Sequence, residues 1–455
     1  MDIKGKKVLV VGMGRSGIAS LEVLVALGAV VSVQDAKGEE KIDQVLLEYL
    51  EKNHVKRYFG REPGVEGQDI LVLSPGVPPT LEFIQKAKKA GSEIIGELEL
   101  GYRLGKGKFI AITGTNGKTT TTNWVGDIFR RSGRRTEIVG NIGKAVIPAA
   151  MKSKEDSWYV TEVSSFQLET IKEFKPAVSA ILNLSPDHMD RHKTMENYGM
   201  IKGRIFENQG SDDYVVVNFD DKETLALSTG AKATVVPFSR TEPLMFGAFV
   251  KNDHIVIRNR EEKIVDICPI DTLKIAGGHN LENALAAAAI AYFSGIDEKI
   301  IREGLQNFSG VEHRLEPCGT IGGVDYVNDS KGTNVNAAIR AIDAIKGKIV
   351  LIAGGYDKDA DFAPLIAAFG DKVKSAVLLG QTAVKIKEAA EKAGFASTII
   401  LEGMEDCVRE AARLAWPGDT VLLSPACASW DMYDNYEERG QHFKNCVVSL
   451  EGKRG

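Results

Sequence analysis

A short apolar run at residues 109–112 that breaks into the glycine-rich turn at residues 114–117 constrains this chain most. The apolar run predicts a buried strand, and residues 120–131 can continue as a helix. Lys118 and Thr119 lie between the turn and that helix. This is the layout of a phosphate-binding loop, in which backbone N–H groups surround the phosphates, the lysine supplies charge and the threonine hydroxyl holds Mg²⁺.

The loop is shorter than the standard pattern, G-x-x-x-x-G-K-[ST], which has a further glycine where this chain has Ile112. So short a pattern also fits an ordinary turn between a strand and a helix. We favour phosphate binding and keep the ordinary turn as the alternative.

Composition and charge limit the class of protein. A chain of 455 residues predicts about three domains, and a content of 44% hydrophobic and 26% charged residues is typical of a globular protein. The net charge of −5, without a Lys/Arg block, argues against nucleic acid and anionic membranes as partners.

Several further features predict a cytoplasmic location. The five cysteines form no CxxC pair, which argues against a disulfide framework or a zinc site and suits a reducing compartment. The N-terminus runs directly into an apolar strand and does not resemble a signal peptide. No apolar run reaches the ~18 residues that a membrane span needs.

A second glycine turn, GMGRSG at residues 12–17, follows the strand expected at residues 7–11. The next strand ends at Asp35, as in a dinucleotide-binding site. However, a unit of about 95 residues lacks the second half of a full NAD domain. We therefore favour the diphosphate of another ligand over nicotinamide, and tight packing alone remains open. The loop Ser74-Pro75-Gly76 follows a further strand of this unit.

In the central region, polar side chains follow apolar strands. Glu162 ends one expected strand and His188 follows the next. Ligands bind beyond the carboxyl ends of parallel strands, and a carboxylate beside a phosphate loop is suited to hold Mg²⁺. Separately, Glu162 could be a surface acid and His188 a capping or buried histidine. Farther on, Asn280 and Asn283 share one end of an Ala-rich helix, where they either cap it or contact a nucleotide.

The last 140 or so residues again alternate strands with helices, which predicts a third Rossmann-like domain. Lys331 and Ser429 could grip a carboxylate there if the fold brings them together. We thus predict an α/β protein: a Rossmann-like domain at residues 1–96, a phosphate-loop ATPase domain with a mainly parallel sheet at 97–311, and a Rossmann-like domain at 312–455.

Six motifs, taken in order, together resemble the Mur ligases, and the match runs nearly end to end. They are TGTNGKTT (113–120), EVSSFQ (162–167), NLSPDHMDRH (183–192), GHNLENA (278–284), EHRLE (312–316) and NDSKGTN (328–334). Within the family, VGNIG (139–143) and LSPACASWD (423–431) are similar to the branch that adds D-glutamate. Another Mur-type amino-acid ligase remains the alternative.

The resemblance implies an amide-bond-forming ligase of peptidoglycan and cell-wall synthesis. ATP would phosphorylate the carboxylate of UDP-N-acetylmuramoyl-L-alanine, and the amine of D-glutamate would attack the acyl phosphate. The implied cofactors are ATP and two Mg²⁺ ions, and we expect a monomer.

Matching positions carry the family's roles onto this chain. The residues implied to be catalytic are Lys118, Glu162, His188 and Lys202. Those implied to bind ATP are Gly114, Thr115, Asn116, Gly117, Lys118, Thr119, Thr120, Asn280, Asn283, Arg314 and Asp329. Those implied to bind the UDP substrate are Gly14, Arg15, Ser16, Asp35, Ser74, Pro75, Gly76, Asn141 and His188.

The other two sets are smaller. The residues implied to bind D-glutamate are Lys331, Thr333, Lys358, Ser429 and Tyr436. The implied metal ligands are Thr119, Glu162, His188 and Lys202. From the residues alone, Lys202 is a solvated helix lysine; the resemblance instead implies a carbamylated lysine, which would be an anionic oxygen ligand.

Two positions are less informative. Tyr356 stands where the family is often acidic, and the contact that Arg15 makes cannot be derived from the pattern. Two other classes of function compete with the ligase. The GMGRSG turn with Asp35 would suit an NAD-dependent dehydrogenase, and the phosphate loop alone would suit a non-catalytic nucleotide switch.

Overall fold

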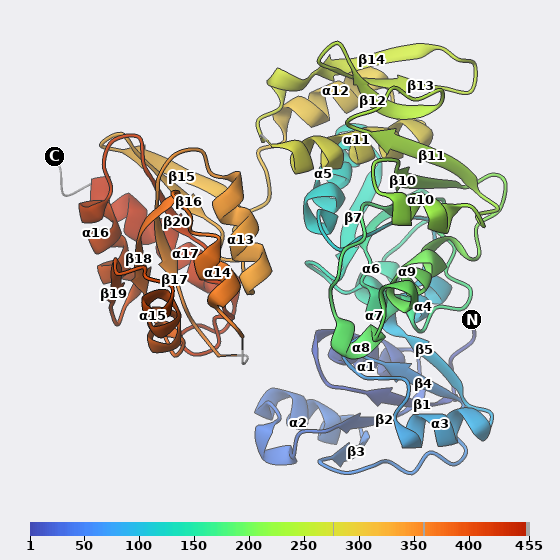
Figure 1. Ribbon diagram of the computed structural model, residues 1–455. Coiled ribbons are helices and arrows are strands. Elements are labelled where there is room, and N and C mark those ends of the chain that lie inside the picture. Colours follow the sequence, from blue (N-terminus) through green and yellow to red (C-terminus); the bar gives the residue numbers. More distant parts are fainter. Residues whose placement is uncertain (276, 358–359, 452–455) are drawn as a thin grey trace. The chain divides into compact units, whose positions relative to one another are not determined.

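The computed structural model describes residues 1–275, 277–357 and 360–451 (Figure 1). By internal contacts the chain divides into two units, Met1–Ser309 and Gly310–Gly455. The first unit contains two sheets and the second contains one, and most strand pairs are parallel. The fold is α/β, as the sequence predicts.

The first sheet has five parallel strands in the order β3-β2-β1-β4-β5. Their bounds are β1 (Lys7–Val11), β2 (Val30–Asp35), β3 (Lys56–Phe59), β4 (Ile70–Leu73) and β5 (Glu93–Gly96). The strand order switches between β1 and β4: β2 and β3 lie on one side of β1, and β4 and β5 lie on the other. The glycine turn after β1 and the loop after β4 therefore flank the switch point at which such sheets bind ligands. A sheet of these five strands does not contain the second mononucleotide-binding half of a full NAD domain.

Both faces of this sheet are buried. Along β1, Val8 and Val10 join one apolar cluster, whereas Leu9 and Val11 join another on the opposite face. This is the near-continuous apolar pattern of a parallel strand covered on both sides.

The central sheet has nine strands in the order β14-β13-β12-β11-β10-β9-β6-β8-β7. Strands from β7 to β12 pair in parallel, and β12, β13 and β14 form an antiparallel extension. Their bounds are β6 (Lys108–Thr113), β7 (Arg135–Gly140), β8 (Ser157–Glu162), β9 (Val178–Ile181), β10 (Tyr214–Asn218), β11 (Thr234–Ser239), β12 (Gly247–Lys251), β13 (His254–Arg258) and β14 (Ile264–Pro269).

Helices of the first unit cover these two sheets. They are α1 (Arg15–Ala26), α2 (Gln44–Lys52), α3 (Glu82–Lys89), α4 (Glu97–Leu104), α5 (Lys118–Arg131), α6 (Val146–Ala150), α7 (Ser165–Leu168), α8 (Met189–His192), α9 (Met195–Gly203), α10 (Lys222–Ser228), α11 (Gly278–Phe293) and α12 (Glu298–Asn307). Helix α11 is apolar on all sides and buried from Asn283 to Ala291, because it packs against both α5 and the sheet. No helix in the described residues is long and apolar enough to cross a membrane.

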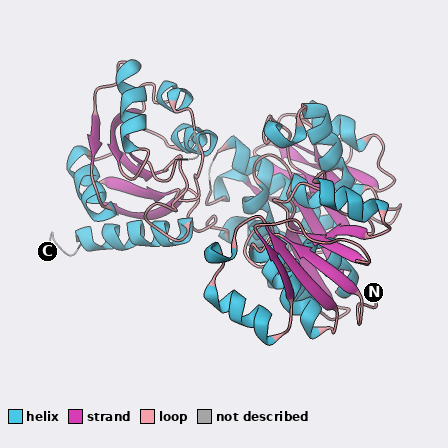
Figure 2. Cartoon of the chain, turned by 90° about the horizontal axis from the view of Figure 1, so that it is seen from below, coloured by secondary structure: helices cyan, strands magenta, loops and turns pink. Residues whose placement is uncertain are grey.

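The second unit has a six-stranded sheet in the order β15-β16-β20-β17-β18-β19, of which only β15 is antiparallel among the described residues. Separate apolar clusters fill its two faces, and Figure 2 shows helices around these strands. The elements are β15 (Glu316–Ile321), β16 (Val324–Asn328), α13 (Val335–Ala344), β17 (Ile349–Ala353), α14 (Ala363–Ala367), β18 (Val373–Leu378), α15 (Ala383–Lys392), β19 (Thr398–Ile400), α16 (Met404–Leu414), β20 (Thr420–Leu423) and α17 (Tyr436–Glu451).

The strands expected from apolar runs are confirmed, and those without such runs were missed by the sequence pattern. Strand β3 reads KRYF and β7 reads RTEIVG, so neither has the apolar content that marks the other strands. Their pairing with β2 and β8 decides their structure instead. The first sheet ends at Gly96, where the sequence predicts a boundary, but contacts place both sheets in one unit.

A buried carboxylate, Glu99 on α4, joins the two sheets of the first unit. It is fully buried and accepts three backbone hydrogen bonds, from the N–H groups of Lys172, Glu173 and Phe174, at 2.9, 2.9 and 3.0 Å. Arg103 donates to Glu99 at 2.6 Å. The same arginine donates to Glu93 at the end of the first sheet.

We expect Glu99→Ala to lower the free energy of unfolding by about 3–5 kcal/mol, because it leaves Nε of the buried Arg103 and three backbone N–H groups without their acceptor. Urea denaturation measures the change. The control is Glu82→Ala, which removes an exposed ion pair with Lys86 and should leave the free energy of unfolding almost unchanged, because water and salt screen such a pair. Equal effects of the two substitutions would contradict the role of Glu99.

Candidate active site

Backbone geometry shapes the phosphate loop between β6 and α5. Gly114 and Gly117 have φ angles of 152° and 78°, and a Cβ on Gly117 would lie 2.2 Å from Oδ1 of Asn283. The loop is held from β9: the N–H of Asn116 donates to Oδ1 of Asn183 at 2.8 Å, and Nδ2 of Asn183 donates to the Asn116 carbonyl at 3.2 Å. The loop is therefore preformed, with glycine required at Gly117.

Two lysine amines meet at one carbonyl of this loop. Nζ of Lys118 donates to the carbonyls of Gly114 and Thr115 at 2.8 and 2.9 Å. Nζ of Lys202 donates to the same Gly114 carbonyl at 2.9 Å and to Oγ1 of Thr113 at 3.2 Å. The site thus brings two basic groups to the place where a phosphate would bind.

Lys202 differs from the solvated lysine that the local sequence indicates. It is 1% exposed, and its amine lies 4.7 Å from the centre of the Tyr198 ring. Burial, and then the charge of Lys118, hold the pKa of Lys202 well below its usual value. The solvated interpretation is wrong because α9 presents this position to the loop rather than to water.

Oxygen atoms suited to Mg²⁺ lie beside the two lysines. Oγ1 of Thr119 donates to Oε2 of Glu162 at 2.8 Å, and Nδ2 of Asn141 donates to Oε1 of the same carboxylate. Glu162 is 2% exposed, so it is not a surface acid. Within the described residues no three His, Cys, Asp or Glu side chains gather as a metal cage. A hydroxyl and one carboxylate fit Mg²⁺, which usually completes its shell with water and phosphate oxygens.

His188 stands at the start of α8 in a left-handed conformation, with φ of 53°. Its side chain is 48% exposed, and its ring centre lies 4.8 Å from that of Phe166. Nε2 lies 3.6 Å from Oδ2 of Asp187. A left-handed histidine is strained, so packing around α8 must hold it there.

Asn283 of α11 contacts the first turns of α5, which follow the phosphate loop. Oγ1 of Thr121 donates to Oδ1 of Asn283 at 3.2 Å, and Nδ2 of Asn283 lies 3.4 Å from Oδ1 of Asn280. The cap of α11 is Gly277, so the capping role considered for Asn280 is wrong. Thr120 is buried in the first turn of α5.

The glycine turn after β1 is tied to its neighbours. The N–H of Met13 donates to Oδ2 of Asp35 at 2.7 Å, and Oγ of Ser74 donates to the carbonyl of Gly12 at 2.7 Å. A Cβ on Gly17 would lie 1.9 Å from the Gly12 carbonyl oxygen, whereas one on Gly14 would meet nothing within 4 Å. Close packing explains why glycine stands at positions 12 and 17. It does not explain Gly14, which borders open space at the N-terminus of α1.

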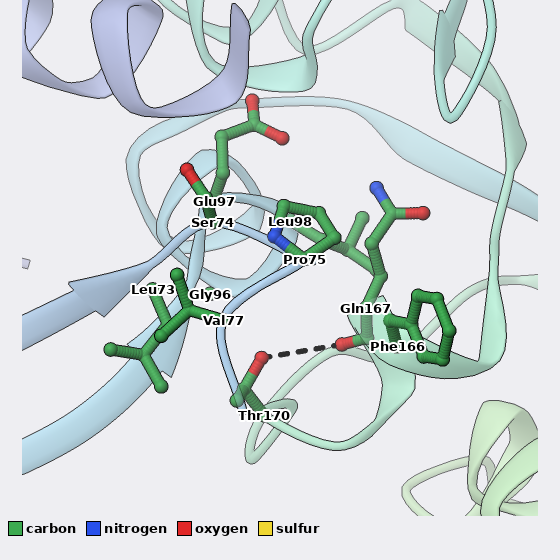
Figure 3. Close-up of a pocket in the computed structure, with 10 residues that line it drawn as sticks. All are labelled: Leu73, Ser74, Pro75, Val77, Gly96, Glu97, Leu98, Phe166, Gln167 and Thr170. Atoms are coloured by element: carbon green, nitrogen blue, oxygen red, sulfur yellow. Dashed lines mark hydrogen bonds between the residues drawn. The ribbon is translucent and has the colours of Figure 1, made fainter. Parts of the chain in front are cut away.

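Arg15 and Ser16 form the first turn of α1, and Arg15 lies near Glu97. Burial raises the pKa of Glu97 to about 7, and the backbone N–H of Ile147 and the charge of Arg15 act in the opposite direction. A small cavity lies between the Ser74-Pro75-Gly76 loop and α7. Figure 3 shows Ser74, Pro75 and Glu97 among the residues that line it.

In the second unit, Asp329 follows β16 and is 4% exposed. It accepts hydrogen bonds from Oγ of Ser424 at 2.7 Å and from the N–H of Leu315 at 3.3 Å. Burial raises the pKa of Asp329 to about 6, and the charge of Arg314 opposes that shift. The structure therefore brings together these two residues, which the family resemblance assigns to ATP.

A buried arginine brings together the loops that carry Lys331 and Ser429. Arg439 donates to the carbonyls of Ser330, Cys427 and Ala428 at 2.8, 3.1 and 3.2 Å. Burial lowers its pKa to about 10. Nothing in the sequence singles out Arg439, because it lies inside a polar helix.

The structure brings together two of the residues expected to bind D-glutamate, Lys331 and Tyr436. Nζ of Lys331 lies 5.4 Å from the ring centre of Tyr436, and Ser429 is buried. Thr333 lines a cavity of about 230 Å³ together with Tyr356. Lys358 lies outside the described residues.

Three family models match successive parts of the chain: the MurD-like N-terminal domain of Mur ligases at residues 6–96, the Mur ligase middle domain at 112–291, and the glutamate ligase domain of Mur ligases at 313–427. A UDP-N-acetylmuramoylalanine–D-glutamate ligase from Thermoanaerobacter sp. (strain X514) is 50% identical over 99% of this chain and 100% of its own length. This chain belongs to the Mur ligase family. The matching enzyme of Clostridioides difficile (strain 630) is 48% identical over 99% of this chain and 100% of its own length.

Solved Mur ligases share the fold. UDP-N-acetylmuramate-alanine ligase from Thermotoga maritima aligns with a TM-score of 0.60 and 18% identity, over 98% of this chain and 99% of that one. A pseudomurein peptide ligase type C from Methanothermus fervidus aligns with a TM-score of 0.57 and 19% identity, over 98% of this chain and 100% of that one. The chain is thus a three-domain Mur ligase, and members of this family are ATP-dependent amide-bond-forming ligases.

We expect Gly117→Ala to weaken MgATP binding at least about tenfold, because displacing Asn283 and the loop costs about 1–3 kcal/mol. Titration calorimetry measures the affinity. Gly133→Ala is a matched control at the other end of α5: its φ is 77°, but a Cβ there meets nothing within 4 Å. The account fails if both substitutions weaken binding equally.

Proposed function

We propose that this Mur ligase joins D-glutamate to UDP-N-acetylmuramoyl-L-alanine at the expense of ATP, through an acyl phosphate. The reaction belongs to the cytoplasmic synthesis of peptidoglycan precursors, and the enzyme acts as a monomer. One observation carries the proposal: Lys118 and Lys202 share the Gly114 carbonyl beside the Thr119–Glu162 pair. The full-length similarity to enzymes named for this reaction supports the choice of substrates.

The reaction has two steps. A carboxylate oxygen of UDP-N-acetylmuramoyl-L-alanine attacks the γ-phosphorus of ATP, the bond to the β-phosphate oxygen breaks, and an acyl phosphate forms. The amine of D-glutamate then attacks the acyl carbon and loses a proton. The tetrahedral intermediate expels phosphate and leaves the amide.

The loop residues of the chain orient the transferring phosphoryl group. Backbone N–H groups between Gly114 and Lys118 bind the phosphates, and Lys118 moves its donors from backbone carbonyls to phosphate oxygens. Thr119 and Glu162 would hold a first Mg²⁺, which would neutralise charge on the phosphates. Asn141, which already fixes Glu162, also faces the muramoyl carboxylate.

Lys202 is suited to carbamylation. The reaction requires a neutral amine, and burial together with Lys118 favours that form. The neutral amine attacks CO₂ and releases one proton, so the resulting carbamate anion lies beside the Lys118 cation. The carbamate oxygens and His188 would hold a second Mg²⁺, which would supply positive charge to the acceptor carboxylate.

Outer sites hold the rest of the substrates. Gly14, Arg15, Ser16, Asp35, Ser74, Pro75 and Gly76 bind the UDP group, where the open space at Gly14 and the helix N-terminus favour a diphosphate. Asn280, Asn283, Arg314 and Asp329 bind ATP, and Lys331, Thr333, Lys358, Ser429 and Tyr436 bind D-glutamate.

Phosphate release tests the substrate assignment. With ATP and UDP-N-acetylmuramoyl-L-alanine present, we expect turnover with D-glutamate and none above background with L-glutamate, L-alanine or L-lysine. Equal turnover with another of these amino acids would overturn the assignment. ATP hydrolysis that does not need either acceptor would instead support a nucleotide switch.

We expect Lys202→Ala to lower kcat at least about 100-fold, because it removes the carbamate oxygens proposed as ligands of the second Mg²⁺. Acetate or formate should restore part of the rate by supplying carboxylate oxygens in the space left. Lys118→Ala is the control: it lacks a cation, so neither acid should help it. Full activity of Lys202→Ala without added acid would rule out the carbamate.

A further inference from the structure

Arg191 connects the turn that carries His188 to the first sheet. Its Nη2 donates to the carbonyl of Val77 at 3.3 Å, in the loop after β4. Nε and Nη2 donate to the two carboxylate oxygens of Glu169, at 3.2 and 2.5 Å. The side chains of Arg191 and Glu169 are only 17% and 10% exposed. A paired, shielded guanidinium of this kind has a fixed geometry.

The turn needs such support. Helix α8 is four residues long, so it cannot be stable by its own hydrogen bonds. Its left-handed first residue, His188, stores strain that surrounding contacts must offset. The orientation of His188 is therefore imposed from outside α8.

Two side chains whose contacts the structure describes, His192 and Arg191, hold this turn, and they contact different parts of the first unit. His192 is buried, and its Nε2 lies 2.9 Å from Oγ of Ser165, which ties α8 to α7 within the central region. Arg191 is the second anchor, and its guanidinium also lies 5.0 Å from the ring centre of Phe166. The hydrogen bond from Arg191 to the Val77 carbonyl connects α8 to the loop after β4 of the first sheet.

The Val77 loop is in turn fixed to the glycine turn after β1. Oγ of Ser74 donates to the Gly12 carbonyl at 2.7 Å, and a Cβ on Gly12 would lie 2.9 Å from Cγ2 of Val77. Val77 and Pro75 line the same small cavity as Phe166 and Gln167 of α7 (Figure 3). Contacts thus run without a gap from the turn at Gly12, through the loop, to Arg191.

We propose that Arg191 is a positioning residue that sets the His188 turn according to the state of the Ser74–Val77 loop. The inference rests on the function proposed above. Binding of the UDP group orders the glycine turn and this loop, which fixes the Val77 carbonyl. Arg191 then holds α8, and His188 faces the reacting carboxylate only when the nucleotide end of the substrate is in place.

Hydrogen exchange with UDP as the ligand tests this connection, because UDP lacks the muramoyl-L-alanine part of the substrate that His188 is proposed to face. In the wild-type chain we expect UDP to slow exchange at residues 12–17 and 74–79, and also at 186–194 by at least about threefold. In Arg191→Ala and Arg191→Lys the first two segments should keep their protection, and residues 186–194 should lose it.

Arg204→Lys is the matched control. Arg204 donates to the carbonyls of Leu168, Glu169 and Ile171, so it supports the same end of α7 without touching the first sheet. This variant should keep the effect of UDP on residues 186–194. Arg191→Lys should also lower kcat about tenfold, with the KM for ATP changed less than about twofold, since misplaced groups affect the chemical step most.

The outcomes separate the two proposals. Protection of residues 12–17 without any at 186–194 in the wild-type chain would overturn the role of Arg191 and leave the UDP site intact. UDP protection of 186–194 that survives in both Arg191 variants would overturn it as well. If UDP protects no segment in the wild-type chain, the UDP site is wrong and the inference falls with it.

Discussion

The candidate active site depends on a close approach of two lysines to one carbonyl. Lys118 and Lys202 both donate to Gly114, and only a loop with a positive φ at Gly114 and Gly117 presents that oxygen to both. Burial disfavours a charged amine, and the neighbouring Lys118 cation adds to this, so the pKa of Lys202 falls. Carbamylation would turn this repulsion into attraction, and it would place metal-binding oxygens where a phosphoryl group is transferred.

Parallel sheets explain how distant residues come together at that carbonyl. Strands β8, β6 and β9 are neighbours, and their carboxyl ends carry Glu162, the phosphate loop and the segment that leads to His188. The first sheet repeats the arrangement, with the glycine turn after β1 beside the Ser74 loop after β4. Each site lies beside a switch in strand order, where the chain leaves an opening for a ligand.

Sequence patterns predicted the parts of this site that depend on local chemistry. Glycines, a Lys-Thr pair and a carboxylate at a strand end are visible in the order of residues, and the structure places Thr119 on Glu162. Contacts between distant side chains left no such signal. Asn183 holds the phosphate loop across 67 positions, and Arg439 reaches Ser330 across 109. Burial of Lys202 depends on how α9 packs, so its sequence alone indicated a solvated lysine.

The central claim is that phosphoryl transfer activates the acceptor carboxylate, and isotope transfer tests it most directly. UDP-N-acetylmuramoyl-L-alanine labelled with ¹⁸O in its free carboxylate would be incubated with the enzyme, MgATP and D-glutamate. The account predicts that each phosphate released carries one ¹⁸O atom from that carboxylate, because the acyl phosphate breaks at the acyl carbon. Released phosphate without the label, alongside a normal yield of amide, would contradict it.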